Sequence, residues 1–328
     1  MTPLEELILS LLAVFSASLL FVNAIEYLAG KMEWTSSFTG SIVTPLFTSV
    51  PELFIFLIAV FTNSGGRGQE IGIGTIIGEP FITSTLSYFL VLLSLVIAFL
   101  LGRTISRSFA VSREMRLPYL LIAILFPWIL IPGFIRSMPL QYVMGGAYLA
   151  SYIAYIWLIR RNDVTSSVEA GEEAYFVRLL GRPIFVSAQI VVSIAALYFG
   201  STLLVHSISQ ISAPNPGSAL SLSILLIPIA TAIPETIASM IWAFTGKNDL
   251  AIGALVGENV LYATFYPGFS LLLVPWSLNM TAAVGILGTA LASAMYYFFV
   301  RKGRIPIYVM GFGLVFFVIY LVSLAILF

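Results

Sequence analysis

The sequence contains no cysteine, only one histidine, and few charged side chains. The absence of cysteine excludes disulfides and thiolate metal sites. Charged residues make up 9% of the 328 residues, whereas soluble domains carry about 25%. Because 15 basic residues balance 15 acidic ones, nucleic acid is not an expected partner. The first ten residues, MTPLEELILS, lack the basic region of a cleaved signal peptide, so we expect residues 5–29 to remain as a first membrane span.

Long apolar runs fill most of the chain. Hydrophobic residues account for 59% of it and the mean hydropathy is +1.03, which is typical of a protein with several membrane spans. Each predicted span is long enough to cross roughly 30 Å of hydrocarbon. The ten predicted spans cover residues 5–29, 36–62, 69–101, 116–135, 139–159, 182–209, 216–245, 249–275, 279–300 and 305–327. We therefore predict an all-α polytopic membrane protein, whose long third span tilts or kinks at Pro80.

A polar segment divides these spans into two groups of five. The predicted domains are an N-terminal five-helix repeat (1–160), a polar linker (161–181) and a C-terminal five-helix repeat (182–328). The linker contains three acidic residues, Glu169, Glu172 and Glu173. We interpret this acidic cluster as part of a solvated linker, because nothing else in the sequence supports a regulatory cation site there.

The basic residues predict the orientation in the membrane. With ten spans, two basic residues, Arg67 and Arg136, fall on one side, and thirteen fall on the other. The thirteen are Lys31, Arg103, Arg107, Arg113, Arg116, Arg160, Arg161, Arg178, Arg182, Lys247, Arg301, Lys302 and Arg304. Because basic loops stay in the cytoplasm, both termini are predicted to lie outside the cell. The membrane itself is predicted to be the plasma membrane of a prokaryote.

The two halves share an internal repeat. Residues 45–52 read PLFTSVPE and residues 228–235 read PIATAIPE, so proline, threonine, proline and glutamate recur at an offset of 183 residues. Further along the chain, Gly78-Glu79 matches Gly257-Glu258 at an offset of 179, because the intervening loop is four residues longer in the first half. An odd number of spans per half places the second copy upside down. This is the inverted-repeat plan of secondary transporters, with the binding site near the midplane.

Four carboxylates lie inside the predicted spans. They form the matched pairs Glu52 with Glu235 and Glu79 with Glu258, and none of these spans carries an internal lysine or arginine. A charge in the membrane needs a partner or a wet cavity, so four acids require a bound cation, protons, or both. Calcium takes about six to eight oxygen ligands. Hydroxyls of Thr48, Ser49 and Thr231, together with carbonyls freed by Pro51 and Pro234, are candidates to complete such a set.

Simpler interpretations of these features remain open. The prolines alone would only kink a helix. Glu79 and Glu258 would be protonated structural residues, so that only two of the four acids, Glu52 and Glu235, would remain in the transport site. The glycine rows, Gly72, Gly74 and Gly78 in one half and Gly253 and Gly257 in the other, are interpreted as close-packing positions. His206 is interpreted as a helix-interface residue, with a proton-relay role as the alternative.

These motifs resemble the alpha repeats of the cation/calcium exchanger superfamily, which includes sodium/calcium exchangers. The matching residues are FTSVPE at 47–52, ATAIPE at 230–235 and KNDLAIG at 247–253. The family pattern is a broken helix with G-T-S-x-P-E, followed by a helix with G-S-N-x-x-N or G-S-N-x-x-D. The resemblance implies ten helices, Glu52 and Glu235 as central cation ligands, and alternating access by sliding of the first and sixth helices.

The sequence departs from the family pattern at the second motif. Glu79 and Glu258 replace the family's serine, and its last polar position falls on Thr83 and Tyr262. The extra carboxylates favour protons as counter-ion or a divalent metal other than calcium.

We therefore predict a secondary active antiporter that exchanges calcium, or another divalent cation, for sodium or protons, without a cofactor. It is expected to be no enzyme, to bind metal cations and membrane lipid, and to be a monomer or weak oligomer. Alternatives are a proton-coupled monovalent cation antiporter and, less well supported, a cation channel or an intramembrane enzyme. The predicted cation-binding residues are Glu52, Glu235, Glu79, Glu258, Thr48, Ser49, Thr231, Thr83 and Tyr262.

Overall fold

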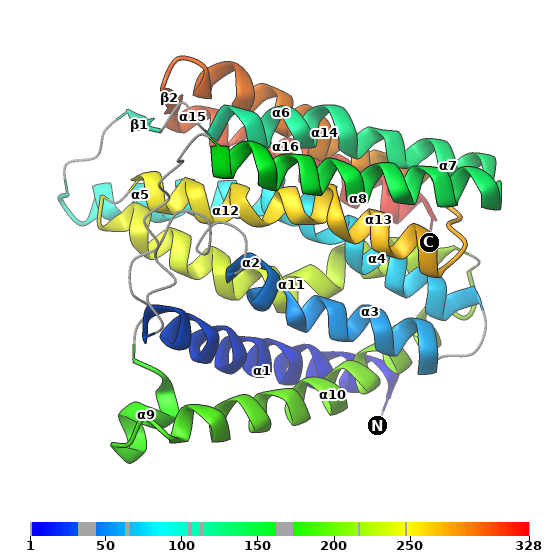
Figure 1. Ribbon diagram of the computed structural model, residues 1–328, viewed down its shortest axis with the longest axis horizontal. Coiled ribbons are helices and arrows are strands. Elements are labelled where there is room, and N and C mark those ends of the chain that lie inside the picture. The colour runs from blue at the N-terminus through cyan, green and yellow to red at the C-terminus, as the bar shows by residue number, and fades with distance from the viewer. Residues whose placement is uncertain are drawn as a thin grey trace.

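The protein folds into a bundle of roughly parallel helices (Figure 1). The structure, a computed structural model, describes residues 2–31, 44–62, 66–103, 107–111, 115–161, 173–215, 217–246 and 248–327. Glu169 and Glu172 of the acidic cluster, and Arg113 and Lys247 of the basic set, lie outside these residues. The described N- and C-terminal ends lie at the same end of the bundle (Figure 1).

The first half consists of α1 to α8. The helices are α1 (Pro3–Lys31), α2 (Thr44–Thr48), α3 (Val50–Thr62), α4 (Gly66–Ile82), the π-helix η2 (Thr83–Ser87), α5 (Tyr88–Leu100), α6 (Arg116–Leu125), the 3₁₀-helix η4 (Phe126–Ile129), α7 (Leu130–Ile135) and α8 (Met138–Arg161).

The second half consists of α9 to α16. Its helices are α9 (Tyr175–Leu180), α10 (Phe185–Ile211), α11 (Ser218–Phe244), α12 (Asn248–Ala263), α13 (Phe265–Leu273), α14 (Met280–Val300), α15 (Ile307–Met310) and α16 (Phe312–Leu327).

Six helical spans in the described residues are long and apolar enough to cross a membrane. They are Pro3–Lys31, Gly66–Leu100, Arg116–Ile135, Phe185–Ile211, Met280–Val300 and Ile307–Leu327. A seventh, α11, passes the same test only as two segments bent by 54°. The remaining predicted spans coincide with α2–α3, α8 and α12–α13. The helical membrane fold is therefore confirmed, whereas the number ten stays a prediction.

The predicted kink in the third span takes a different form. Pro80 lies inside α4, and the π-helix η2 begins three residues later. A single π-turn inside a helix is a common way to absorb a local break and is frequent at functional sites. The span from Gly66 to Leu100 nevertheless runs for 35 residues as one unit.

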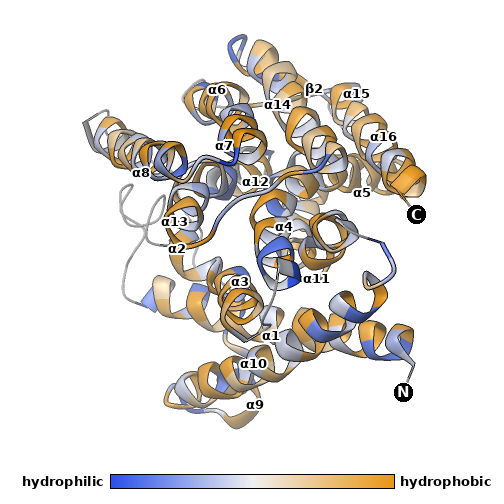
Figure 2. Ribbon diagram, turned by 90° about the vertical axis from the view of Figure 1, so that its right-hand side faces the viewer, coloured by the Kyte–Doolittle hydropathy of each residue, from blue (hydrophilic) through white to orange (hydrophobic). Residues whose placement is uncertain are grey.

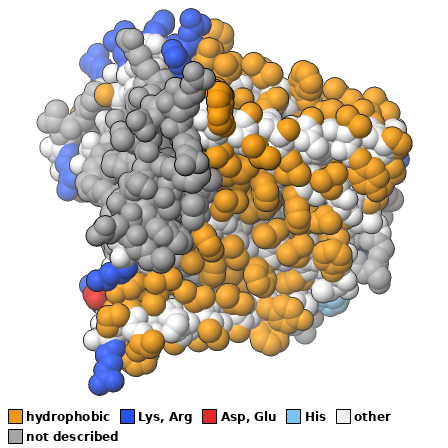
Figure 3. All heavy atoms as spheres, in the orientation of Figure 1, with side chains coloured by type: hydrophobic (Ala, Val, Ile, Leu, Met, Phe, Trp, Pro, Cys, Tyr) orange, Lys and Arg blue, Asp and Glu red, His pale blue; other side chains and the backbone are white. Residues whose placement is uncertain are grey.

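A small β-sheet is the exception to the all-α prediction. Strand β1 (Ser108–Ala110) pairs antiparallel with β2 (Arg304–Pro306). These three-residue strands belong to loops that carry basic residues, so the sheet joins the two halves at the basic end. In Figure 3, lysine and arginine side chains gather along the left edge, the histidine lies at the lower right, and hydrophobic side chains cover much of the described surface between them.

The centre of the bundle is tightly packed where α4 crosses α11 (Figure 2). A methyl group at Gly78 would lie 2.5 Å from the carbonyl oxygen of Ile224 and 2.7 Å from the Pro228 ring. One at Gly74 would lie 2.5 Å from the Ser223 Cβ. Glycine therefore allows the two backbones to approach closely here, which confirms the packing interpretation for these two positions.

The other glycines behave less uniformly. A methyl group at Gly72 would lie 2.9 Å from the Val60 side chain, and one at Gly253 would lie 3.2 Å from Met115. Among the described residues, no atom lies within 4 Å of such a group at Gly257. Close packing thus explains the first glycine row but finds no support at Gly257.

The described part of the predicted linker is not wholly solvated. Helix α9 buries Val177, and the backbone N–H of Tyr175 donates to the Asn23 side chain over 2.9 Å. The N–H of Phe176 donates to the Gln189 side chain over 2.8 Å. The end of the linker is therefore attached to α1 and α10 by hydrogen bonds.

Candidate cation-binding site

Both repeated proline–glutamate motifs interrupt their helices. Ser49 lies outside helical geometry between α2 and α3, and α11 bends between Ile233 and Glu235. Proline removes a backbone hydrogen bond and disfavours a straight helix, which explains a break at each copy. The interruptions place Glu52 in the first turn of α3 and Glu235 directly after the bend of α11.

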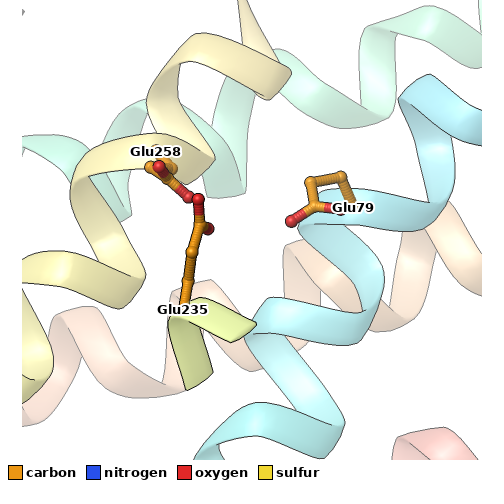
Figure 4. Close-up of side chains that lie close together, drawn as sticks. All are labelled: Glu79, Glu235 and Glu258. Atoms are coloured by element: carbon orange, nitrogen blue, oxygen red, sulfur yellow. The ribbon is translucent and has the colours of Figure 1, made fainter. Parts of the chain in front are cut away.

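Three of the four predicted carboxylates come together in space. One oxygen from each of Glu79, Glu235 and Glu258 lies within 4.8 Å of the others. Figure 4 shows that they come from α4, α11 and α12, and that the Glu235 side chain extends towards Glu258. Glu79 is buried, whereas Glu235 and Glu258 are partly exposed. A cluster of this kind offers oxygen ligands to a hard cation.

Glu52 completes the set from a slightly separate position. Its side chain is 3% exposed, and its Oε2 has no hydrogen-bond partner among the described atoms. The hydroxyls of Thr231 and Tyr262 approach its carboxyl group. Buried polar atoms are normally hydrogen-bonded, so an unpartnered carboxylate oxygen at this depth is suited to a ligand.

Each half supplies a threonine to a glutamate of the other half. Thr48 Oγ1 donates to Glu258 Oε1 over 2.6 Å, and Thr231 Oγ1 donates to Glu79 Oε2 over 3.4 Å. Thr48 and Thr231 are partners in the repeat, as are Glu258 and Glu79. The two threonine–glutamate contacts are therefore equivalent in the repeat, although the Thr231–Glu79 contact is longer than the Thr48–Glu258 contact.

Two of the carboxyl groups point towards each other. The Glu235 side chain extends towards Glu258, and one oxygen of each lies within 4.8 Å of the other. Because two ionised carboxylates repel each other at this separation, the pair favours a shared proton or a bound cation. The described neighbours of the four carboxyl groups are hydroxyls and one another, with no lysine or arginine among them. The arrangement is thus able to hold either protons or a cation.

The remaining predicted residues lie around this cluster. The Thr83 hydroxyl lies beside Glu79 in the π-helix η2, and Tyr262 is buried on α12 near Glu52. Ser49 does not contact a carboxylate among its described hydrogen bonds. Its hydroxyl bonds to the hydroxyl of Tyr266 over 2.6 Å and to the carbonyl of Leu46 over 3.3 Å.

The sequence analysis overlooked Tyr266. Its hydroxyl also donates to the Ser49 carbonyl over 3.2 Å, so a residue of α13 fastens the break between α2 and α3. Its ring stacks on Tyr262 with centroids 4.7 Å apart. A signal was present, because Ser87 matches Tyr266 at the offset of 179 and also carries a hydroxyl. Ser87 bonds to Thr236 over 2.6 Å.

Asn259 is a second residue beside the cluster. Its Nδ2 donates to Ser84 Oγ over 3.2 Å, whereas its Oδ1 is buried without a described partner. It follows Glu258 directly in α12 and retains the asparagine of the family pattern, which Pro80 replaces in the first half.

The interrupted helices and their shared acidic cluster define a membrane transporter for cations. The chain belongs to the sodium/calcium exchanger protein family, whose model matches residues 6–160 and 185–328. It is therefore a cation/calcium antiporter.

Individual relatives are more distant. CaxA of Alkalimonas amylolytica is 32% identical over 94 residues, which cover 29% of this chain and 30% of that protein. The inner membrane protein YrbG of Escherichia coli (strain K12) is 22% identical over 280 residues, covering 83% of this chain and 80% of YrbG.

Solved structures share the fold. The H⁺/Ca²⁺ exchanger CAX superimposes with a TM-score of 0.71 at 17% identity, over 99% of this chain and 82% of CAX. The sodium–calcium exchanger NCX_Mj gives a TM-score of 0.58 at 20% identity, over 98% of this chain and 97% of NCX_Mj. At these identities, the likeness establishes the fold alone.

Proposed function

We propose that the protein exchanges a divalent cation, best fitted by calcium, for protons at a site formed by Glu52, Glu79, Glu235 and Glu258. The observation that carries this proposal is the convergence of Glu79, Glu235 and Glu258, with one oxygen of each within 4.8 Å of the others and the Glu235 side chain extended towards Glu258. Carboxyl groups this close repel each other when ionised, so a site that takes up protons when empty and offers oxygen ligands when deprotonated exchanges the two kinds of ion at one place.

Charge balance favours protons over sodium as counter-ion. Four ionised carboxylates around one divalent cation leave a net charge of −2 in a low-dielectric site, and no described basic side chain offsets it. One or two bound protons remove this excess. Sodium would instead need additional neutral oxygen ligands, and the last polar position of the family pattern is occupied by Tyr262 in the second half.

The hydroxyl residues act as supporting groups in this proposal. Thr48 and Thr231 orient Glu258 and Glu79 by their hydrogen bonds, and Thr83 and Tyr262 line the same cluster. Ser49 acts through Tyr266 to hold the helix break, rather than as a ligand in the conformation described.

The wider architecture follows the same reasoning. We propose ten spans in two inverted five-helix repeats, with residues 161–181 as the connection and the basic end in the cytoplasm of a prokaryotic cell. The corresponding threonine–glutamate contacts support this arrangement, because an inverted repeat places matched residues opposite each other across the pseudo-twofold axis.

Calcium uptake into proteoliposomes under separately imposed proton and sodium gradients tests the function. We expect uptake driven by an outward proton gradient, accompanied by proton efflux, and no stimulation by sodium. Uptake driven only by sodium would refute proton coupling. Exchange of protons for sodium or potassium without calcium movement would instead establish the monovalent cation antiporter, and currents without counter-transport would establish a channel.

A further inference from the structure

A second titratable group lies far from the acidic cluster, at the outer edge of the bundle. His206 Nδ1 and Glu6 Oε1 are 2.7 Å apart, and they join α10 to the beginning of α1. His206 is 58% exposed and Glu6 13% exposed. The histidine appears at the end of the molecule opposite the basic residues (Figure 3). This pair, which we term the acidic clasp, lies close to the first residue of α1, Pro3, and the last residue of α10, Ile211.

A matching contact joins the same two helices at their other end. Gln189 Nε2 of α10 donates to Asn23 Oδ1 of α1 over 3.0 Å and to the Leu20 carbonyl over 2.8 Å. We term the Asn23–Gln189 pair the neutral clasp. Both of its side chains are buried.

The two clasps are equivalent in the repeat. Glu6 and Gln189 are 183 residues apart, and so are Asn23 and His206, which is the offset of the two proline–glutamate motifs. Each clasp therefore joins the same two repeat positions, one from α1 and one from α10. The chemistry differs between them, because the neutral clasp consists of two amides and the acidic clasp consists of two titratable groups.

We propose that Glu6 and His206 form a second proton-binding site, separate from the transport site, whose occupancy fastens α1 to α10 at the face opposite the basic end. Histidine is the side chain that ordinarily changes charge between about pH 5 and pH 8. Protonation converts a neutral hydrogen bond into a charge-assisted one, which is roughly twice as strong.

Gln210 is able to hydrogen-bond to His206 in both the neutral and the protonated state of the imidazole ring. Gln210 lies one turn further along α10, with its side-chain amide nitrogen 3.1 Å from His206 Nε2. When the ring is neutral and Nδ1–H donates to Glu6, Nε2 accepts from this amide. When the ring is protonated, the amide needs only to rotate by half a turn to present its oxygen.

Few other charged side chains lie near the acidic clasp on the described helices that pack against it. Glu5, beside Glu6 on α1, accepts from the Thr2 backbone N–H over 2.8 Å. From α4, Arg67 extends to the Ala213 carbonyl just beyond α10, 3.4 Å away, and Glu70 follows one turn later. The α3 helix carries one titratable residue, which belongs to the transport site, and α11 likewise carries only its site glutamate.

Hydrogen exchange measured on the purified, full-length protein tests this site without requiring transport. The double variant Glu6→Gln/His206→Asn copies the neutral clasp at the acidic position and serves as the reference at each pH. We expect the protection of residues 3–10 and 203–211, relative to this variant, to rise about two- to fivefold between about pH 7.5 and pH 5.5. A ratio that does not change with pH would overturn the proposal.

The neutral clasp provides the matched control. Asn23→Ala should reduce protection at the basic end of the α1–α10 pair by the same factor at every pH. His206→Asn alone should abolish the pH effect at the other end as fully as the double variant does, and a retained effect would assign it to another group.

The flux consequence rests on the proposed transport function. Acidification on the clasp side should slow calcium turnover at saturating calcium by about two- to fivefold, and the double variant should lose this component while keeping its calcium affinity. If calcium transport by the wild type proved not to be coupled to protons, the proposed function would be refuted. The pH dependence measured by hydrogen exchange would still stand. The two failures are therefore distinguishable.

Discussion

Replacing Glu258 by glutamine should change the number of protons that leave when calcium binds. In the proposed mechanism, the neighbouring Glu235 and Glu258 carboxyl groups share a proton when no cation is bound, and a cation that takes both carboxylates as ligands must displace it. The glutamine amide donates to Glu235 without an acidic proton. The variant therefore binds calcium with about one proton fewer released.

The size of the effect follows from the geometry. Two ionised carboxylates separated by the 4.8 Å that bounds the cluster repel each other by about 3.5 kcal/mol at an effective dielectric of about 20. This repulsion favours the retention of a proton by the pair when no cation is bound. Each released proton makes calcium affinity fall roughly tenfold, about 1.4 kcal/mol, for each unit by which the pH is lowered.

Isothermal titration calorimetry in buffers of different ionisation enthalpy measures the released protons directly. We expect Glu258→Gln to release about one proton fewer when calcium binds. Its calcium affinity should therefore change about tenfold less for each pH unit than that of the wild type. Glu79→Gln is the repeat-matched comparison, and it should have the smaller effect because the Glu235 side chain extends towards Glu258 rather than towards Glu79. Glu70→Gln, which alters a half-buried carboxylate on the same helix, should change neither quantity.

An unchanged proton count in Glu258→Gln would refute this reasoning. If calcium affinity also stayed the same in a Glu79→Gln/Glu258→Gln double variant, both glutamates would be structural residues. Proton exchange would then have to occur at Glu52 and Glu235 alone.

Four further outcomes are expected. Glu52→Gln or Glu235→Gln should each reduce calcium transport to near background in proteoliposomes, with unchanged thermal unfolding, because each removes a central ligand. Tyr266→Phe should lower calcium affinity by about tenfold, roughly 1 to 1.5 kcal/mol, through loss of one hydrogen bond at the helix break; unaltered binding isotherms would contradict its positioning role. Gly78→Val should destabilise the protein by about 3 kcal/mol or more through overpacking, read as a fall in melting temperature. A cysteine introduced at Thr2 should react with an impermeant thiol reagent only from outside the cell, and labelling only from the cytoplasm would reverse the orientation.

The sequence alone was sufficient to predict the helical membrane fold and the exchanger family. Apolar runs long enough to cross the membrane predict the helical spans. The proline–glutamate motif, repeated at one offset, leaves few protein families other than the exchangers that fit. The proximity of Glu79 and Glu258 to Glu235 was also predictable, because antiparallel helices joined by short loops return to the same depth. Three of the four acids indeed meet within 4.8 Å.

Other features depend on tertiary contacts that leave weak signals in the sequence. The π-helix after Pro80 could not be distinguished from a simple kink, because both follow from the same missing hydrogen bond. The strand pair β1–β2 is too short to show a period. Tyr266 was missed because it fastens Ser49 from a different half, 217 residues away. His206 lies at a helix interface, as interpreted from the sequence, but nothing in its local sequence identified Glu6 as its partner.

The crossed threonine–glutamate contacts have a consequence for how the protein is made. Glu79 receives the Thr231 hydroxyl, which follows it by 152 residues in the chain. At a synthesis rate of about 5–20 residues per second, roughly 8–30 s separate the two residues at the ribosome. During that interval the first half must enter the membrane with its acids unmatched, so a neutral, protonated form is the state in which Glu79 can be inserted. In the proposed proton exchanger, a proton on Glu79 would thus serve membrane insertion before it serves transport.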